Sequence, residues 1–393
     1  MTDHIRNGGE TFSVSAMLAA GSTETGLDDF GDEEFREALT RLVDSTNREM
    51  DLSPIGVMAF KGEVHRSLVN RLRFAADLKR HPEILGEEMD DPIIVTGLPR
   101  TGSTKLQRMM AADPDTHGLR FWQMMNPAPF ANAIAGAEDP RIEHARQAVS
   151  MLLQISPGFA QSHPAQFDDV DEEVFLQLHT FKCMLTSLSH PAPAYGEWLK
   201  RQPMQGTYRY MKQLLQYLQW QNGGRRGKPW ILKSPVHLAH LDLLLDLFPK
   251  ATVVVTHRHL HDAIPSFCRL MENSWGIKIA AVDKHAVGRL ALDLWPNELR
   301  EHLRVRDALG KRLNIIDVQY RAIKDDAMEV IGDVYRKAGR ELTPQRRQAM
   351  LGWEAQNPQH QQGSYSYRLE DYGLTRAGID SAFSDYLQRF PDG

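Results

Sequence analysis

The chain has 393 residues, of which 42% are apolar and 25% charged, which is the composition of an ordinary soluble globular protein. Its formal net charge of −5 gives no support to general binding of nucleic acid or of an anionic membrane, so any polyanionic ligand must be held by a local group of side chains. The two cysteines, Cys183 and Cys268, are far apart and in no C-x-x-C spacing. This argues against a disulfide framework or a zinc site and suits a reducing, cytoplasmic compartment.

The first quarter of the chain precedes the region where strands are predicted. Residues 1–25 are rich in Gly, Ser and Thr and are expected to form a flexible segment. Over residues 26–90 the apolar residues recur at helical spacing, which predicts helices that pack on the core. The apolar patch Val14–Ala20 is too short and too weakly basic for a signal peptide, and no run reaches the length that a membrane span needs.

From residue 91 onward, short β-rich runs alternate with helical patterns. The run "DDPIIVTG" is followed by a helix-rich stretch at about residues 120–228, and then come "PWILK", "ATVVVTH" and "RLNIIDVQY", each with a helical pattern behind it. Such alternation implies right-handed crossovers and a parallel sheet. Residues 91–393 are therefore predicted to form one α/β domain, a P-loop-like three-layer sandwich with a mostly parallel central sheet and a large helical insertion. Ligands of such sheets bind at the carboxyl ends of the strands.

The stretch "IIVTGLPRTGSTKLQRMM", residues 93–110, has the layout of a phosphate-binding loop between a buried strand and a helix. Gly97, Gly102 and Thr104 stand at the Walker A spacing G-x-x-x-x-G-K-[ST], but Ser103 occupies the lysine position. The glycines let the backbone turn tightly, and a helix N-terminus favours negative charge. An anion site is predicted from the positive charge of Arg100, the amides of residues 102–104 and the two hydroxyls.

A second anion site is suggested by "VVVTHRHLHDAIPSF". Arg258 lies in the loop after a strand, and Ser266 stands near the start of the next helix, so the two can form a charge-assisted phosphate clamp. A salt-bridged loop arginine would give the same pattern. His257, His259 and His261 alternate, but no carboxylate or second histidine cluster completes a ligand set, so no metal site is predicted.

A third group lies in "WILKSPVHLAHLD". Lys233 ends a strand and could stabilise charge on a transferring group, while His237 begins the next helix and could accept a proton. A hydrogen bond at the start of that helix is the alternative role for His237.

Taken together, these elements resemble the sulfotransferases that use 3′-phosphoadenylyl sulfate (PAPS), most closely the bacterial branch and its tyrosylprotein-sulfotransferase-like relatives. The resemblance runs from about Asp91 to Tyr386. It rests on the order and spacing of "PRTGST", "RFWQMMNPAPF", "WILKSPVHL", "THRHLHDAIPS", "YSYRLEDYGLT" and "FSDYL".

The resemblance implies a role for each group. The family's 5′-phosphosulfate loop matches five consecutive residues: Arg100, Thr101, Gly102, Ser103 and Thr104. No Walker lysine is needed, because PAPS has no γ-phosphate. The 3′-phosphate site matches Arg258 and Ser266, Lys233 matches the lysine that contacts the phosphosulfate, and residues 363–367 resemble the segment that closes over the nucleotide.

The implied reaction transfers SO3 from PAPS to an acceptor hydroxyl or amine and leaves 3′,5′-ADP, with no metal required. Arg100 and Lys233 would neutralise the charge that builds on the phosphate oxygens. Relatives often carry a glutamate base after the tryptophan that Trp122 matches, but this chain has Gln123, which takes no proton at neutral pH. The remaining candidates for the base are His237, His163 and the carboxylates of Asp171, Glu172 and Glu173; His237 is preferred, with Glu172 and His163 behind it.

The helical stretch also predicts the acceptor. Its aromatic and methionine side chains indicate a hydrophobic small-molecule or lipid acceptor, such as a sterol or a polyketide alcohol. These side chains are Phe121, Trp122, Met124, Met125, Phe130, Phe159, Phe167 and Trp198. No nucleic-acid partner is expected, and a homodimer is left open.

Two other functions stay open. One is a nucleotide-binding homologue that has lost catalysis, as Gln123 would suggest. The other is a P-loop kinase of a small molecule, which Ser103 and the lack of a clear Walker B carboxylate disfavour.

Overall fold

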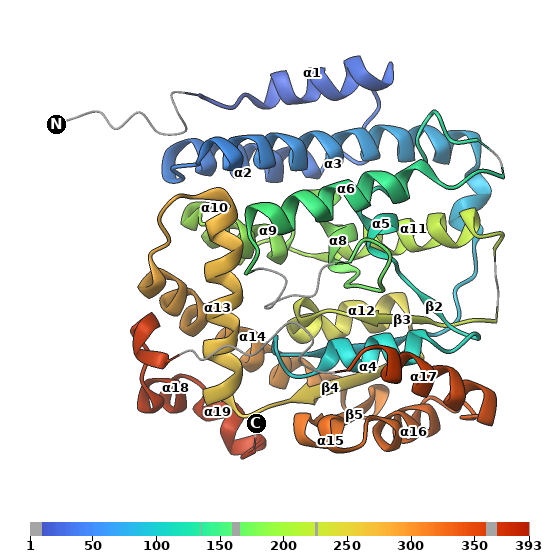
Figure 1. The fold of residues 1–393 in the computed structure, drawn as a ribbon, viewed down its shortest axis with the longest axis vertical. Coiled ribbons are helices and arrows are strands. Elements are labelled where there is room, and N and C mark those ends of the chain that lie inside the picture. Colours follow the sequence, from blue (N-terminus) through green and yellow to red (C-terminus); the bar gives the residue numbers. More distant parts are fainter. Residues whose placement is uncertain (1–9, 135, 159–165, 225–226, 359–367, 393) are drawn as a thin grey trace.

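The computed structural model describes residues 10–134, 136–158, 166–224, 227–358 and 368–392. At its centre lies a five-stranded sheet of order β2-β3-β1-β4-β5, in which all neighbouring strands are parallel (Figure 1). The strands are β1 (Ile93–Gly97), β2 (His117–Gly118), β3 (Trp230–Lys233), β4 (Thr252–His257) and β5 (Asn314–Gln319). Four of them lie where the sequence predicted strands. The two-residue β2 was missed because so short a strand leaves no periodic pattern.

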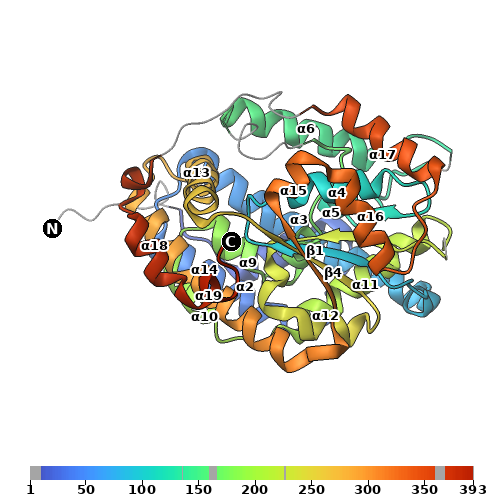
Figure 2. The same ribbon diagram turned by 90° about the horizontal axis from the view of Figure 1, so that it is seen from below.

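Helices cover both faces of the sheet. On one side lie α4 (Ser103–Ala111), α15 (Tyr320–Asp325), α16 (Ala327–Lys337) and α17 (Pro344–Gln356); on the other lie η4 (Pro235–His240), α12 (Leu241–Leu247), α14 (Lys284–Leu309) and η5 (Gly310–Arg312). Successive strand residues point to opposite faces. Ile93 and Val95 accordingly join the apolar cluster of α4 and α16, whereas Ile94 joins the cluster of α12 and α14. Figure 2 shows α4, α15 and α16 on one side of β1 and β4 and α12 on the other, which confirms the three-layer α/β fold.

Helices from the first 90 residues form a further layer at the top of Figure 1. They are α1 (Val14–Thr25), α2 (Phe35–Glu49) and α3 (Pro54–Arg80). The short η2 (Pro82–Gly86) follows α3 along the chain. Their apolar side chains belong to the same cluster as those of the middle helices and of β3. The buried guanidinium of Arg71 in α3 donates a 3.2 Å hydrogen bond to the carbonyl oxygen of His179 and lies 4.1 Å from the ring centroid of Phe35. The N-terminal helices therefore share one continuous core with the rest of the molecule.

The helix α1 differs from the flexible segment that the sequence predicted. Ser13 accepts a hydrogen bond from the Ala16 amide at its start, and Gly26, with φ 68°, ends it in a left-handed turn. Val14, Met17 and Leu18 pack against the main core. The prediction was wrong for residues 14–25, because even a Gly- and Ser-rich stretch becomes helical when its apolar face packs on a neighbour. Residues 1–9 lie outside the described part.

The middle of the chain fills the space between the N-terminal helices and the sheet. Its helices are α5 (Phe121–Met125), α6 (Pro140–Ile155), α8 (Val174–Gln177), η3 (Leu178–Thr180), α9 (Met184–Ser189), α10 (Pro193–Leu199) and α11 (Gln205–Gln221). The remaining helices, α13 (Leu260–Lys278), η6 (Leu369–Tyr372), α18 (Arg376–Ala382) and α19 (Ser384–Arg389), pack together with α14 in a second cluster. No helix in the described ranges is long and apolar enough to cross a membrane.

Candidate active site

Three neighbouring strands bring the predicted residues to one edge of the sheet. β1 pairs with β3 on one side and with β4 on the other. Lys233 ends β3, Arg100 follows β1 and Arg258 follows β4. Because the strands are parallel, their carboxyl ends and the loops after them meet at the same edge.

Positive φ angles bend the loop between β1 and α4. They are 140° at Gly97, 71° at Arg100 and 83° at Gly102. Gly97 must be glycine, because an added Cβ would lie 2.4 Å from the carbonyl oxygen of Thr256 in the next strand. A positive φ is uncommon for arginine, and such strained residues cluster at functional sites.

Thr101 fastens this loop to β4. Its side chain is fully buried, donates a 2.7 Å hydrogen bond to the carbonyl oxygen of Leu98 and lies 2.6 Å from the hydroxyl of Thr256. The Thr256 hydroxyl donates in turn to the carbonyl oxygen of Thr96, at 3.1 Å. The side chain of Thr101 thus shapes the loop and does not face an open site.

The first turn of α4 offers hydrogen-bond donors. Its N-cap residue, Gly102, has no side chain to satisfy the first amides of the helix. Ser103 and Thr104 are half-buried, and within the described ranges neither hydroxyl has a hydrogen-bond partner. Free amides and hydroxyls at a helix N-terminus are the usual elements of an anion site.

The two predicted anion sites meet in one cluster. Arg100 Nε donates a 3.0 Å hydrogen bond to Ser266 Oγ, and Arg258 Nη1 donates a 2.8 Å bond to the carbonyl oxygen of Arg100. The Arg258 guanidinium lies 4.5 Å from the ring centroid of Tyr320. Its buried Nε has no hydrogen-bond partner in the part of the chain that the structure describes. A buried donor without a partner needs an explanation, and an anion bound beside it would supply one.

Lys233 lies on the other side of β1. Its Nζ is 2.5 Å from Glu172 Oε1, and the second oxygen of Glu172 accepts a 3.2 Å hydrogen bond from the hydroxyl of Ser234. Lys233 is almost wholly buried, whereas the Glu172 side chain keeps 20% of its surface exposed. The ion pair therefore presents a carboxylate to the edge of the sheet with an ammonium group directly behind it.

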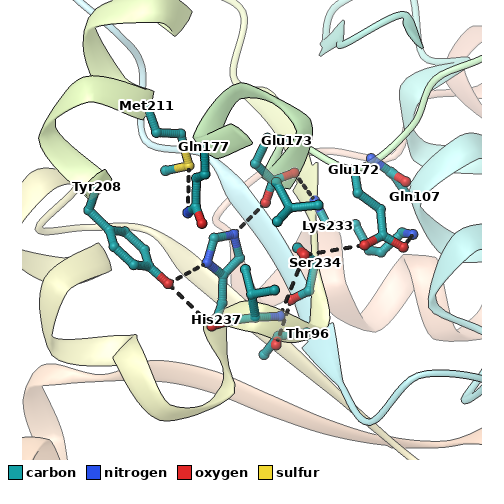
Figure 3. Close-up of polar contacts among 12 residues, drawn as sticks. Thr96, Gln107, Glu172, Glu173, Gln177, Tyr208, Met211, Lys233, Ser234 and His237 are labelled. Atoms are coloured by element: carbon teal, nitrogen blue, oxygen red, sulfur yellow. Dashed lines mark hydrogen bonds and ion pairs between the residues drawn. The ribbon is translucent and has the colours of Figure 1, made fainter. Parts of the chain in front are cut away.

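A second set of contacts lies deeper, behind Lys233 (Figure 3). Glu173 Oε2 accepts a 2.7 Å hydrogen bond from the main-chain N–H of Lys233, and Glu173 Oε1 lies 2.5 Å from His237 Nε2. The other ring nitrogen of His237 lies 2.9 Å from the hydroxyl of Tyr208. His237 has no exposed surface and both of its nitrogens are engaged, so it has no face open to a substrate.

Comparison with known proteins identifies the chain. Its sequence matches the sulfotransferase family over residues 92–344. The chain belongs to the sulfotransferase family. No curated protein matches its sequence. Two crystal structures are similar to this chain over nearly their whole length, both at 28% sequence identity. Sulfotransferase STF1 from Mycobacterium tuberculosis H37Rv has a TM-score of 0.77, and the match covers 95% of this chain and 99% of that one. Sulfotransferase STF9 from Mycobacterium avium has a TM-score of 0.82, and the match covers 97% of each chain.

The N-terminal helices belong to the sulfotransferase fold found in STF1 and STF9. The family match begins at residue 92, but the two mycobacterial structures cover 95% and 97% of this chain. Most of the first 91 residues therefore have a counterpart in both, which agrees with the core that they share with the middle helices.

Gln123 of this sulfotransferase has a structural contact of its own. Its Oε1 accepts a 3.1 Å hydrogen bond from the main-chain N–H of Arg120 and so caps α5, with only 8% of the residue exposed. The neighbouring Trp122 donates a 3.2 Å bond from its indole nitrogen to Asp168. Gln123 is thus held at the start of a helix.

Several predicted residues fall elsewhere. Phe159, His163 and residues 363–367 lie outside the described residues. His257 contacts the hydroxyl of Tyr386 at 2.6 Å and the carboxylate of Asp317 at 3.0 Å. The described residues contain no group of three His, Cys, Asp or Glu side chains that could hold a metal ion. Tyr208 was missed by the sequence analysis, because a tyrosine within an amphipathic helix carries no local signal of a contact with His237.

Proposed function

We propose that this sulfotransferase takes its sulfuryl group from PAPS and transfers it to a hydroxyl or amine of a hydrophobic small-molecule or lipid acceptor, releasing 3′,5′-ADP. The observation that supports this most is the joined cluster of Arg100, Ser266 and Arg258 beside Lys233. PAPS carries two separate anionic groups, the phosphosulfate and the 3′-phosphate. A cationic site with two parts, built on adjacent strands, suits such a donor.

The residues present fit this donor on three observations. The first turn of α4 has no side-chain cap, the hydroxyls of Ser103 and Thr104 have no described partner, and the buried Nε of Arg258 is unpaired in the described part of the chain. Arg100 and the α4 amides would hold the 5′-phosphosulfate, and Arg258 and Ser266 would hold the 3′-phosphate. The donor supplies the sulfuryl group and leaves as 3′,5′-ADP, so the protein contributes position and charge.

Each side chain near the reacting bond then has one task. Lys233 and Arg100 neutralise the negative charge that develops on the phosphate side as the S–O bond breaks. Glu172 is the only candidate base among the described residues that keeps exposed surface at the strand edge. We therefore propose that its carboxylate takes the proton that the substrate hydroxyl or amine loses. The new bond joins the acceptor oxygen or nitrogen to sulfur, and the proton lost from that atom goes to the Glu172 carboxylate.

The acceptor class rests on the half-buried aromatic side chains of the middle segment. Met124, Met125 and Trp198 are core residues, so they do not contribute. The half-buried candidates are Phe121, Trp122, Phe130 and Phe167. An arginine guanidinium lies over three of these rings, and the one of Arg141 is 4.9 Å from the ring centroid of Trp122. The acceptor is accordingly proposed to be an apolar body with a polar group.

Titration calorimetry tests the donor site directly. The ligands are 3′,5′-ADP, ADP and ATP with magnesium, and the proteins are the wild type, Arg258→Ala and a control, Arg336→Ala, whose side chain is 77% exposed on α16. We expect 3′,5′-ADP to bind the wild type best and Arg258→Ala to bind it roughly 10- to 100-fold more weakly, since one charge-assisted contact is lost. Arg336→Ala should match the wild type. Preference for ATP with magnesium would favour a kinase instead.

A further inference from the structure

Two consecutive glutamates hold Lys233 from different sides. Glu172 binds its charged end at 2.5 Å, and Glu173 accepts its main-chain N–H at 2.7 Å. Figure 3 shows both contacts made by the segment that leads into α8. The backbone and the ammonium group of one lysine therefore depend on the same two residues.

The contact from Glu173 replaces a missing strand partner. In a parallel sheet the amides of successive residues point to opposite sides. The Ser234 amide donates to Val95 in β1 at 3.1 Å, so the Lys233 amide points toward β2. However, β2 pairs only with Trp230 and Ile231 and ends before it reaches Lys233. The Glu173 carboxylate accepts this N–H in place of a backbone carbonyl, and a buried amide left unpaired there would cost about 1–3 kcal/mol.

Glu173 is itself fixed from behind. It has no exposed surface, and its other oxygen lies 2.5 Å from His237 Nε2. The hydroxyl of Tyr208, which comes from α11 in the helical middle, lies 2.9 Å from His237 Nδ1. In a neutral imidazole whose Nε2 donates to the carboxylate, Nδ1 accepts from the tyrosine hydroxyl, which also lies 3.4 Å from the Val236 carbonyl oxygen. The chain of contacts thus runs from α11 to the end of β3 without a gap.

We propose that Glu173, His237 and Tyr208 form a positioning unit that sets the place of Lys233, and with it Glu172, for sulfuryl transfer. The inference rests on the proposed function, in which Lys233 neutralises negative charge on the donor. His237 then touches no substrate and acts through Glu173 and Lys233. Loss of the unit lets the end of β3 shift, and a displacement of about 1 Å at such a residue costs on the order of 100-fold in rate.

A double-mutant cycle separates positioning from simple stability. Equilibrium binding of PAPS is measured for His237→Gln, Tyr208→Phe and Lys233→Met, and for His237→Gln combined with Lys233→Met. The controls lose equally buried groups outside the unit: His302→Gln, whose histidine contacts the Leu238 carbonyl at 3.0 Å, and Tyr335→Phe, whose hydroxyl contacts Asp113 at 2.8 Å.

We expect His237→Gln to weaken PAPS binding roughly 10-fold and Tyr208→Phe roughly 3-fold, in line with the loss of one or two hydrogen bonds. In the Lys233→Met protein, His237→Gln should have no further effect, because the lysine through which it acts is gone. Both controls should lower the unfolding temperature and keep the PAPS affinity. An equal effect of His237→Gln with and without Lys233 would overturn the proposal.

Hydrogen exchange of the Lys233 amide gives a readout that needs no ligand. It should become faster in His237→Gln and in Tyr208→Phe but not in His302→Gln, because the first variant loses the imidazole that holds Glu173 and the second loses the hydroxyl that holds this imidazole. If the wild type binds neither PAPS nor 3′,5′-ADP, the proposed function fails, and this exchange still decides whether the unit holds Lys233. Unchanged exchange in both variants contradicts the unit. Tyr208→Phe removes a single hydroxyl, so it serves if His237→Gln does not fold.

Discussion

Arg100 Nε donates a 3.0 Å hydrogen bond to Ser266 Oγ, although the two residues are 166 positions apart and follow different strands. Arg258 completes the connection through the carbonyl oxygen of Arg100. The residues that the sequence assigns to two separate phosphate groups are therefore already in contact. A substitution in one of the two phosphate sites is therefore expected to change ligand binding at the other, because Ser266 and Arg258 both position Arg100.

Ser266→Ala tests this coupling. The variant loses the hydroxyl that accepts from Arg100 and that we propose donates to the 3′-phosphate, so binding of 3′,5′-ADP should weaken roughly 10-fold. Calorimetry gives the affinity. Ser45→Ala is the matched control, since Ser45 is a similarly buried serine in α2, a helix of the N-terminal region that contributes no residue to the proposed site. If Ser266→Ala binds as well as the wild type, the hydroxyl has no part in the site.

Gly97→Ala should destabilise the whole protein. The added Cβ would lie 2.4 Å from the Thr256 carbonyl oxygen at a φ of 140°, so β1 and β4 would have to move apart. We expect a loss of at least about 2 kcal/mol in the free energy of unfolding, measured by urea denaturation. Gly62→Ala in α3 is the control. No atom lies within 4 Å of its added Cβ, so helix propensity should stabilise that variant by up to about 1 kcal/mol.

The sequence predicts the position of a residue in this site only where neighbouring residues in the chain form a recognisable pattern. Lys233 and Arg258 could be placed at one edge of the sheet from the sequence, because each stands at the end of a short apolar run and parallel strands bring such ends together. The roles of Glu172 and Glu173 were not separable, because neighbouring carboxylates look alike in a sequence. Only the packing of the folded chain places Glu172 at the exposed edge of the sheet and Glu173 in the interior.

His237 shows the same limit more sharply. The sequence gives a histidine at the start of a helix, which suits both a base and a buried hydrogen bond. Its partners Glu173 and Tyr208 lie 64 and 29 positions away, on elements whose contact is made only by the tertiary fold. No spacing rule connects residues at such distances, so the choice between the two roles needed the structure.

Glu298 predicts a specific dependence of stability on pH. Burial, followed by repulsion from Glu301, raises the pKa of this carboxyl group in α14 to about 7. The unfolded chain releases this proton near its ordinary pKa of 4.5, so between that pH and about 7 the folded protein binds more protons. Its free energy of unfolding therefore falls as pH rises through this range, by roughly 3 kcal/mol in total.

Glu298→Gln removes this titration. The free energy of unfolding of the variant should equal that of the wild type near pH 4.5 and exceed it by roughly 3 kcal/mol at pH 8, as measured by urea denaturation across this pH range. Glu341→Gln, an exposed position between α16 and α17, is the control and should follow the wild type at every pH. A constant difference between Glu298→Gln and the wild type at all pH values would show that packing, and not the charge, is responsible.

Glu172→Gln separates proton transfer from donor binding. The amide keeps the size of the side chain and an oxygen for Lys233, but it cannot take the acceptor's proton. We expect turnover, measured as 3′,5′-ADP release from PAPS with the best of a panel of apolar alcohols and phenols, to fall about 10²- to 10³-fold. Affinity for 3′,5′-ADP should stay the same or rise, because a negative charge beside the anionic donor is gone. Glu197→Gln, which makes the same change at an exposed carboxylate paired with Lys200 in α10, should leave both quantities unchanged. A fall in affinity without a fall in turnover would make Glu172 a binding residue and return the search for the base to other side chains.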